Sequence, residues 1–311
     1  MGSTRQSRHP RQAGAAAQRA AARLAAAVTR YALPILPVVF LLVFLVCPLL
    51  LTFAISFWQR TGFTVTPALQ IHSYLTFFSG VRLLVFERSV LVAVEATAIS
   101  LLIAYPVAYF LAFHAGARSV RTCLSLFTVP FVINYIIRTF AWTWLLDRNG
   151  PVNGLLQWLG VVHHPLSWLL YSDFSVQVGL VSAYTPFMVF PLWLSLAGIE
   201  RKLIEASWML GAGPVRTWLG VILPLSLPGV FAASIFGFVG SFGEAAVPRI
   251  LGGVGYQLIG NSIASAMDVL DYPLAAAISS VVVITMLGLL AAWFLAFDLK
   301  VLFGKIVEWQ R

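Results

Sequence analysis

Six long apolar stretches alternate with shorter polar segments along the chain. The apolar stretches run near 33–57, 89–113, 122–146, 174–198, 222–243 and 273–297. About 20 apolar residues are enough to span the hydrocarbon core of a bilayer. Because backbone groups cannot stay unpaired in lipid, each stretch is expected to be a helix. The pattern therefore predicts an all-α polytopic membrane protein with six transmembrane helices.

Composition and charge agree with this class. Hydrophobic residues make up 60% and charged residues 10% of the 311 residues, whereas a soluble domain has about 25% charged residues. With the amino end inside, the predicted cytoplasmic segments hold fourteen Lys or Arg residues, and the outer segments hold five, which are Arg60, Arg82, Arg88, Arg148 and Arg249. This bias predicts that both termini are cytoplasmic. The net charge of +9 then reflects topology and weak attraction to anionic lipid, and we expect no nucleic-acid partner.

The two ends of the chain lie outside the predicted bundle. We expect residues 1–30 to form a basic cytoplasmic arm, residues 31–300 the six-helix membrane domain, and residues 301–311 a cytoplasmic tail. No A-x-A cleavage site follows the first apolar run, so the first span is expected to be an uncleaved anchor. The Arg- and Ala-rich arm is also typical of an organellar transit peptide. Cys47 and Cys123 lie in different spans, which indicates neither a disulfide framework nor a metal site.

Two outer loops and several prolines add detail. The turn at 150–154 precedes a short segment, 155–159, that is expected to be a helix at the membrane interface. In the outer loop 244–272, Leu251-Gly252-Gly253 is flexible enough to fold back among the helices. Broken helices are common around transport sites, although simple kinking also explains the prolines within four spans: Pro34, Pro37, Pro48, Pro106, Pro130, Pro186 and Pro191.

The segment 199–220, between the fourth and fifth spans, is the most distinctive polar element. Apolar residues recur at helical spacing and predict one apolar face: Ile199, Leu203, Ala206 and Leu210. Gly211 suits the left-handed position that ends a helix, and Gly213-Pro214 suits the start of the next. The segment therefore predicts a rigid helix–turn–helix whose ends continue into transmembrane helices, so it can transmit a push.

This segment resembles the cytoplasmic loop of bacterial ABC importer permeases. The family pattern is EAA, three residues, Gly, nine residues, then I-x-L-P. It is matched here by Glu205-Ala206-Ser207, Gly211, Val221, Leu223 and Pro224, with Ser207 and Val221 as departures. The resemblance implies a type I ABC importer permease fold. It also implies that the loop docks into a groove on an ATPase subunit, where Glu205 makes a polar contact.

Residues 130–280 are similar, more narrowly, to the spermidine/putrescine permeases. The matching stretches are 137–142, 184–188, 223–229 and 251–253. This resemblance implies a bacterial inner-membrane importer of polyamines or related small organic cations. It further implies four kinds of partner: a second permease that is a different chain, two ATPase subunits, a solute-binding protein and membrane lipid.

The chain itself lacks the signature of an ATPase. A phosphate-binding loop requires G-x-x-x-x-G-K-S/T, but Gly304-Lys305 is followed by Ile306, and Leu299 stands where the first glycine is needed. We therefore expect a transport subunit with no catalytic residue and no cofactor or metal of its own, and ATP and Mg on the partner ATPases.

Two charged residues fall inside predicted spans, Glu95 in the second and Arg138 in the third. A charge at the bilayer centre costs about 3 kcal/mol, so both are expected to face the bundle. They either pair with each other and brace the helices, or Glu95 lines the path of a cationic substrate.

Further pathway candidates lie near the outer ends of the spans. Carboxylates and aromatic faces can bind a polycation. The candidates of this kind are Tyr135, Trp142, Asp147 and Glu244. Trp142 and Trp144 point about 200° apart on a helix, so they cannot both line one narrow path. Asp268 and Asp271 either help to seat a binding protein or are solvated loop charges.

Two other classes of protein compete with an importer. A secondary transporter driven by an ion gradient usually needs several membrane acids and a repeated bundle, and neither is evident. An intramembrane enzyme needs a motif such as H-E-x-x-H or G-x-S-x-G, and the chain contains neither.

Overall fold

The computed structural model describes residue 35 and residues 37–62 and 64–296, so the predicted arm 1–30 and tail 301–311 lie outside the described residues. The chain divides into two compact units, with the boundary between Ile55 and Ser56. The predicted membrane domain 31–300 therefore has its first span in one unit and the remaining spans in the other, and each unit is described by itself.

The first unit contains an apolar helix from Pro37 to Ile55, long enough to cross a membrane. Within it a π-helical turn, η1 (Leu42–Val46), precedes α2 (Cys47–Ile55). The N–H of Cys47 donates to the carbonyl of Leu42. Pro48 has no N–H to donate, and such a wide turn accommodates the missing hydrogen bond.

The second unit begins with a small element that the apolar pattern did not predict. Strands β1 (Gln59–Thr61) and β2 (Thr64–Thr66) pair antiparallel, and α3 (His72–Phe78) follows. Next comes α4 (Val81–Phe113), so the second predicted span begins earlier than residue 89.

The third predicted span is not one continuous helix, which corrects the expectation of a single span over 122–146. The structure has α5 (Ala117–Val132) and then α6 (Tyr135–Leu146), and the pair is bent by 89°. Pro130 removes a backbone donor before the break. After the break, the Asn134 side chain accepts from the N–H of Ile136 at 2.9 Å and so caps α6. The turn and short helix expected near 150–159 are confirmed as α7 (Pro151–Trp158).

The rest of the unit is also helical. Its elements are η2 (Ser167–Leu169), α8 (Asp173–Ala197), α9 (Arg201–Met209), α10 (Pro214–Thr217), the π-helical η3 (Trp218–Ile222), α11 (Leu223–Phe242), α12 (Ala246–Leu251), α13 (Ile259–Asp268) and α14 (Tyr272–Ala296). The described residues contain five helices long and apolar enough to span a membrane, or six if the bent pair counts as one span. The helical membrane-protein fold class is thus confirmed, and the prediction of six spans holds only if the bent pair is counted as the third span.

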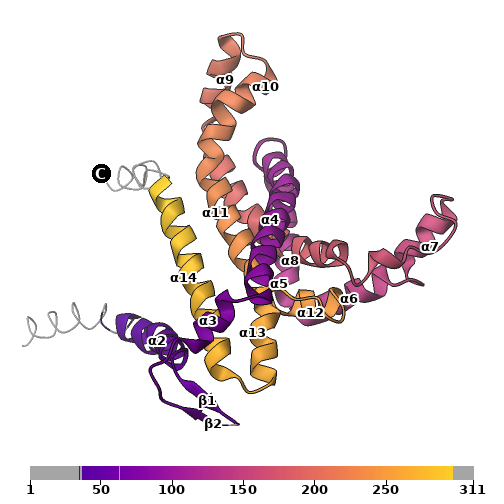
Figure 1. The fold of residues 1–311 in the computed structure, drawn as a ribbon. Coiled ribbons are helices and arrows are strands. Elements are labelled where there is room, and N and C mark those ends of the chain that lie inside the picture. The colour runs from indigo at the N-terminus through magenta and orange to yellow at the C-terminus, as the bar shows by residue number, and fades with distance from the viewer. Residues whose placement is uncertain (1–34, 36, 63, 297–311) are drawn as a thin grey trace, which may run out of the picture. The chain divides into compact units, whose positions relative to one another are not determined.

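Helices α4, α8 and α11 pack against one another and form the centre of the second unit (Figure 1). Small residues such as Ala104, Ala108 and Ala233 lie in this core beside Met188 and Leu192. Small side chains let helix backbones approach closely. Because lipid tails are as apolar as the side chains, this close van der Waals packing helps to hold membrane helices together.

The loop 244–272 does fold back among the helices, as α12 and α13. Val247 and Leu251 of α12 are fully buried. A Cβ on Gly179 of α8 would lie 2.5 Å from Leu251 Cδ1, so α8 needs glycine there to accept α12.

Candidate functional site

The segment predicted as helix–turn–helix has that structure, and we call residues 199–220 the coupling hairpin. At the end of α9, the N–H of Gly211 donates to Trp208 O at 2.9 Å and that of Ala212 donates to Ser207 O at 3.1 Å. Gly211 has φ +78°, so this is the Schellman arrangement that ends a helix with a left-handed residue. Pro214 then begins α10 at its first turn.

The predicted apolar face of α9 is wrong in part. Ile199 is buried as expected, but the residue of α9 that packs inward is Ile204, whereas Leu203 and Leu210 are exposed. Position 204 faces the end of α4 and α10, and a cavity of about 220 Å³ lies beside it. That cavity is lined by Tyr109, Phe113, His114, Ile204, Trp208 and Pro214, among others.

Contacts inside the coupling hairpin make it one body. The hydroxyls of Ser207 and Thr217 lie 3.0 Å apart and join α9 to α10, so the serine that departs from the family pattern takes part in this contact. Ahead of Pro224, the π-helical η3 lets the N–H of Leu223 donate to Trp218 O. The helix therefore passes into α11 despite the proline.

Glu205 and Ala206 lie at the surface of the coupling hairpin, and Glu205 also lines the cavity beside Ile204. Both are exposed, and among the residues that the structure describes no side chain pairs with the Glu205 carboxylate. The carboxylate is therefore free to meet a partner chain.

A buried polar cluster lies where α6, α8 and the start of α12 meet. Glu244 is only 8% exposed. Its Oε2 accepts from the Tyr184 hydroxyl at 2.7 Å, and its Oε1 accepts from the N–H of Ala246 at 2.8 Å. Tyr135 lies beside this carboxylate, and its buried hydroxyl makes no hydrogen bond with the described residues. The structure therefore brings Tyr135 and Glu244 together, and adds Tyr184, which the sequence did not single out.

The other aromatic and acidic candidates take structural positions. The Trp142 indole N–H donates to the Ser182 hydroxyl at 2.8 Å, and its ring packs against the hydrophobic cluster that contains Val247 and Leu251. Trp144 is exposed. Their opposite directions agree with the helical spacing. Asp147 ends α6 and accepts from the N–H of Asn149 at 2.9 Å, so its carboxylate stabilises a turn.

The ion pair between Glu95 and Arg138, one of the two alternatives that the sequence left open, does not form. Glu95 is exposed on α4 and its Oε2 accepts from Gln177 Nε2 of α8 at 3.0 Å. Arg138 is directed back to the carbonyl of Pro130 at 3.4 Å, which lost its helical donor at the break between α5 and α6. The bend in the third span therefore places Arg138 against a backbone carbonyl and not against the Glu95 carboxylate.

A second group of polar contacts holds the amino-terminal ends of α4 and α8 to the segment 252–258. Asp173 Oδ1 accepts from Arg88 Nη2 at 2.7 Å and from the Tyr256 hydroxyl at 2.6 Å. The Arg88 guanidinium also lies 4.4 Å from the centre of the Tyr256 ring. Burial raises the pKa of Tyr256, and so does its bond to Asp173, so the phenol stays protonated as a donor at physiological pH.

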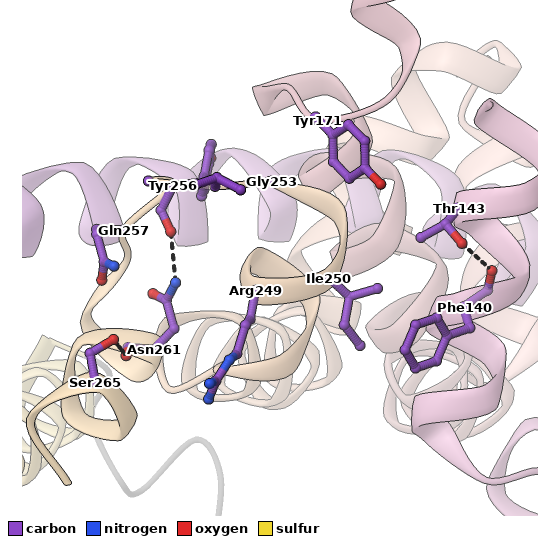
Figure 2. Close-up of a pocket in the computed structure, with 12 residues that line it drawn as sticks. Phe140, Thr143, Tyr171, Arg249, Ile250, Gly253, Tyr256, Gln257, Asn261 and Ser265 are labelled. Atoms are coloured by element: carbon purple, nitrogen blue, oxygen red, sulfur yellow. Dashed lines mark hydrogen bonds between the residues drawn. The ribbon is translucent and has the colours of Figure 1, made fainter. Parts of the chain in front are cut away.

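Beside this contact is a pocket of about 770 Å³ between α6, α12 and α13. Figure 2 shows Phe140 and Thr143 on one side and Arg249, Tyr256 and Asn261 on the other. Arg249 is the charged group of the lining, and it pairs with Asp268 at 3.0 Å. An aromatic and amide lining with a guanidinium does not match a polycation, so we do not assign the pocket as a cation site.

Known proteins with a similar sequence or structure agree with this arrangement. Residues 96–300 match the model of the binding-protein-dependent transport system inner membrane component. The chain belongs to this family. It is 33% identical over 257 residues to the spermidine/putrescine transport system permease protein PotB of Escherichia coli (strain K12), which covers 81% of this chain and 92% of PotB.

Two further similarities agree with this assignment. The inner membrane ABC transporter permease protein YdcU of Escherichia coli (strain K12) is 31% identical, over 78% of this chain and 80% of YdcU. The crystal structure of a bacterial ABC transporter involved in the import of the acidic polysaccharide alginate has a chain of the same fold. The TM-score is 0.65 at 16% identity, and the match covers 87% of this chain and 96% of that chain.

This family is one of ABC importer permeases, so the chain is a multi-pass inner-membrane permease subunit, and ATP hydrolysis belongs to separate ATPase subunits. The ion-gradient-driven transporter and the intramembrane enzyme are therefore set aside.

Proposed function

We propose that this permease imports polyamines or related small organic cations. A solute-binding protein delivers the cation, two ATPase subunits supply the energy, and a second, different permease completes the pathway. The similarity to PotB supports the class of substrate. The coupling hairpin is the observation that carries the proposed mechanism, because its EAA-type pattern and its rigid, exposed structure occur together.

The coupling hairpin has the surface and the rigidity that are needed to bind an ATPase subunit and to pass its movement to the membrane helices. Leu203 and Leu210 are exposed apolar side chains on the same element as the unpaired Glu205 carboxylate. An ATPase groove that takes this element buries the apolar side chains and offers a donor to the carboxylate. Movement of the hairpin then reaches α11 directly, because α10, η3 and α11 follow one another without a loop. On this proposal the coupling hairpin is cytoplasmic.

A charge reversal tests the docking role. We expect Glu205→Arg, in the complete importer reconstituted into vesicles, to abolish transport and substrate-stimulated ATP hydrolysis while the helical content and thermal unfolding of the permease stay unchanged. Glu200→Arg is a matched control, since Glu200 is also exposed and directly precedes α9. Normal transport by Glu205→Arg contradicts docking through this residue.

For the substrate, we propose that Glu95 lines the pathway. It is exposed in the second unit although it lies within a membrane span, and a carboxylate that faces lipid is unfavourable by about 3 kcal/mol. A pathway shared with the second permease offers this carboxylate water and a cationic partner. We retain Tyr135, Trp142, Asp147 and Glu244 as secondary candidates. Since both oxygens of Glu244 are already engaged, a substrate ammonium group would have to share them.

The test replaces Glu95 with Gln, which removes the charge and keeps the shape and the contact with Gln177. We expect weaker uptake of radiolabelled spermidine or putrescine with ATP present, and no uptake by either protein when ATP is withheld under a proton gradient. Unchanged uptake by Glu95→Gln together with lower thermal stability would assign Glu95 a bracing role instead. Measuring which solute the cognate binding protein captures tests the substrate class directly.

A further inference from the structure

A polar cavity of about 470 Å³ in the second unit has no role in the functions described above. It lies between the β-hairpin, the start of α3, the start of α4 and the start of α14. Its charged and titratable lining residues are Arg60, His72, Arg82 and Asp271, and Gln59 and Gln70 add amide groups. We call this the basic cavity.

The basic cavity lies at the end of the unit opposite to the coupling hairpin. Helix α4 has 33 residues and is therefore about 50 Å long. Tyr109 and Phe113, near its carboxyl end, line the small cavity beside the coupling hairpin, whereas Arg82, in its first turn, lines the basic cavity. Figure 1 shows α3 and the β-hairpin at the end away from α9 and α10. If the coupling hairpin is cytoplasmic, as we propose, the basic cavity faces outward.

The charge of this cavity is positive because its one carboxylate is already engaged. Asp271 Oδ2 lies 3.7 Å from Arg60 Nη1, and Asp271 Oδ1 accepts from the N–H of Leu274 at 3.2 Å. Arg82 is exposed, and no carboxylate among the described residues pairs with it. Two guanidinium groups against one carboxylate leave one positive charge without a counterpart.

The acidic residues that the sequence offered as a docking site are thus neutralised. Asp268 pairs with Arg249, and Asp271 pairs with Arg60. Among the charged residues that line the basic cavity, the guanidinium of Arg82 remains available to a partner, in a cavity large enough to admit a side chain. We therefore expect a positive group of this chain to meet a negative group of the partner, whereas a docking role for the two aspartates would have required the opposite charges.

We propose that the basic cavity is a docking point for the solute-binding protein, which inserts a carboxylate side chain beside Arg82. This inference rests on the proposed function, which supplies the binding protein as the partner on this side of the membrane. An arginine can hold a carboxylate through two parallel hydrogen bonds, which fixes orientation. A charge at the rim of an interface acts mainly on the association rate and its salt dependence.

The experiment measures association of the solute-loaded binding protein with the complete importer in nanodiscs of neutral lipid. We expect Arg82→Glu to slow association about tenfold at low ionic strength, with a smaller difference at high ionic strength because salt screens the contact. Basal ATP hydrolysis should stay unchanged, which shows that the subunits still assemble. Arg148→Glu is the matched control, since Arg148 is an exposed outer arginine that does not line the cavity.

The outcomes separate the alternatives. Restored association when an acidic surface residue of the binding protein is changed to arginine, in combination with Arg82→Glu, identifies the partner carboxylate and supports the proposal. Equal slowing by Arg148→Glu, or no slowing by Arg82→Glu, overturns it. If Arg82→Glu leaves association unchanged and removes only a stabilisation by added anionic lipid, the cavity holds a lipid phosphate and the proposal is again overturned. If the unaltered importer captures no binding protein, the proposed function itself fails.

Discussion

The left-handed turn at Gly211 offers the sharpest test of how the coupling hairpin is held. Gly211 has φ +78°, and a Cβ placed there would meet nothing within 4 Å. Replacing it with alanine therefore adds no steric clash and isolates the backbone conformation. A residue with a Cβ is less stable in this conformation by roughly 1–2 kcal/mol. We expect Gly211→Ala to weaken the turn by that amount.

Gly213 is a control only two residues away. Its φ is −72°, and a Cβ there also meets nothing within 4 Å. Because alanine readily adopts that conformation, we expect Gly213→Ala to be neutral or slightly stabilising. Gly211→Asn should fall between the two variants, since asparagine tolerates the left-handed region better than alanine.

Hydrogen exchange of the peptide 208–213 in the purified importer measures this difference. The N–H groups of Gly211 and Ala212 are bonded in the turn, so a loss of 1–2 kcal/mol should speed their exchange by a factor of roughly 5–30. Exchange in helices distant from the turn should change much less, and the temperature of unfolding should fall by only a few degrees. The reasoning is refuted if the two alanine variants exchange equally fast, or if Gly211→Ala exchanges like the unaltered protein.

Two further predictions concern the buried region around Glu244. Tyr184→Phe removes a donor to that carboxylate and should lower the free energy of unfolding by about 1–3 kcal/mol. Thermal unfolding in detergent measures this loss. Tyr109→Phe is the control and should have little effect, because the Tyr109 hydroxyl bonds to no described residue. Gly260→Ala would force a Cβ against the backbone oxygen of Glu244 and should be destabilising by about 1–3 kcal/mol or more. Gly288→Ala is the control and should be neutral or stabilising, because a Cβ at position 288 meets nothing within 4 Å. Equal unfolding temperatures for the two glycine variants would contradict the close approach at Gly260.

Several features follow from the sequence because their causes are local. A long apolar run must become a helix in lipid, since only a helix satisfies its backbone within the segment, and this determined the spans. Gly211 and Pro214 act on their own φ angles, so the coupling hairpin could also be predicted from its residues. The spacing of the EAA-type motif then indicated the family, which the comparisons confirm.

Other features depended on how each helix is rotated about its own axis. The spans are apolar on nearly every side, so the sequence does not indicate which residues face a neighbour. For this reason the contact of Glu95 with Gln177 appears only in the structure. The burial of Glu244 beside Tyr184 and the inward position of Ile204, which lie outside the spans, also depend on neighbours distant in sequence.

The break between α5 and α6 shows the same division of causes. Pro130 marked a weak point in the third span, and kinking was expected there as at other prolines. The 89° bend and the new partner of Arg138 appear only in the structure, where α6 packs with α7, α8 and α12. Local chemistry along the chain determined which segments are helices and where they can turn, whereas the pairing of charges depended on contacts between segments distant in sequence.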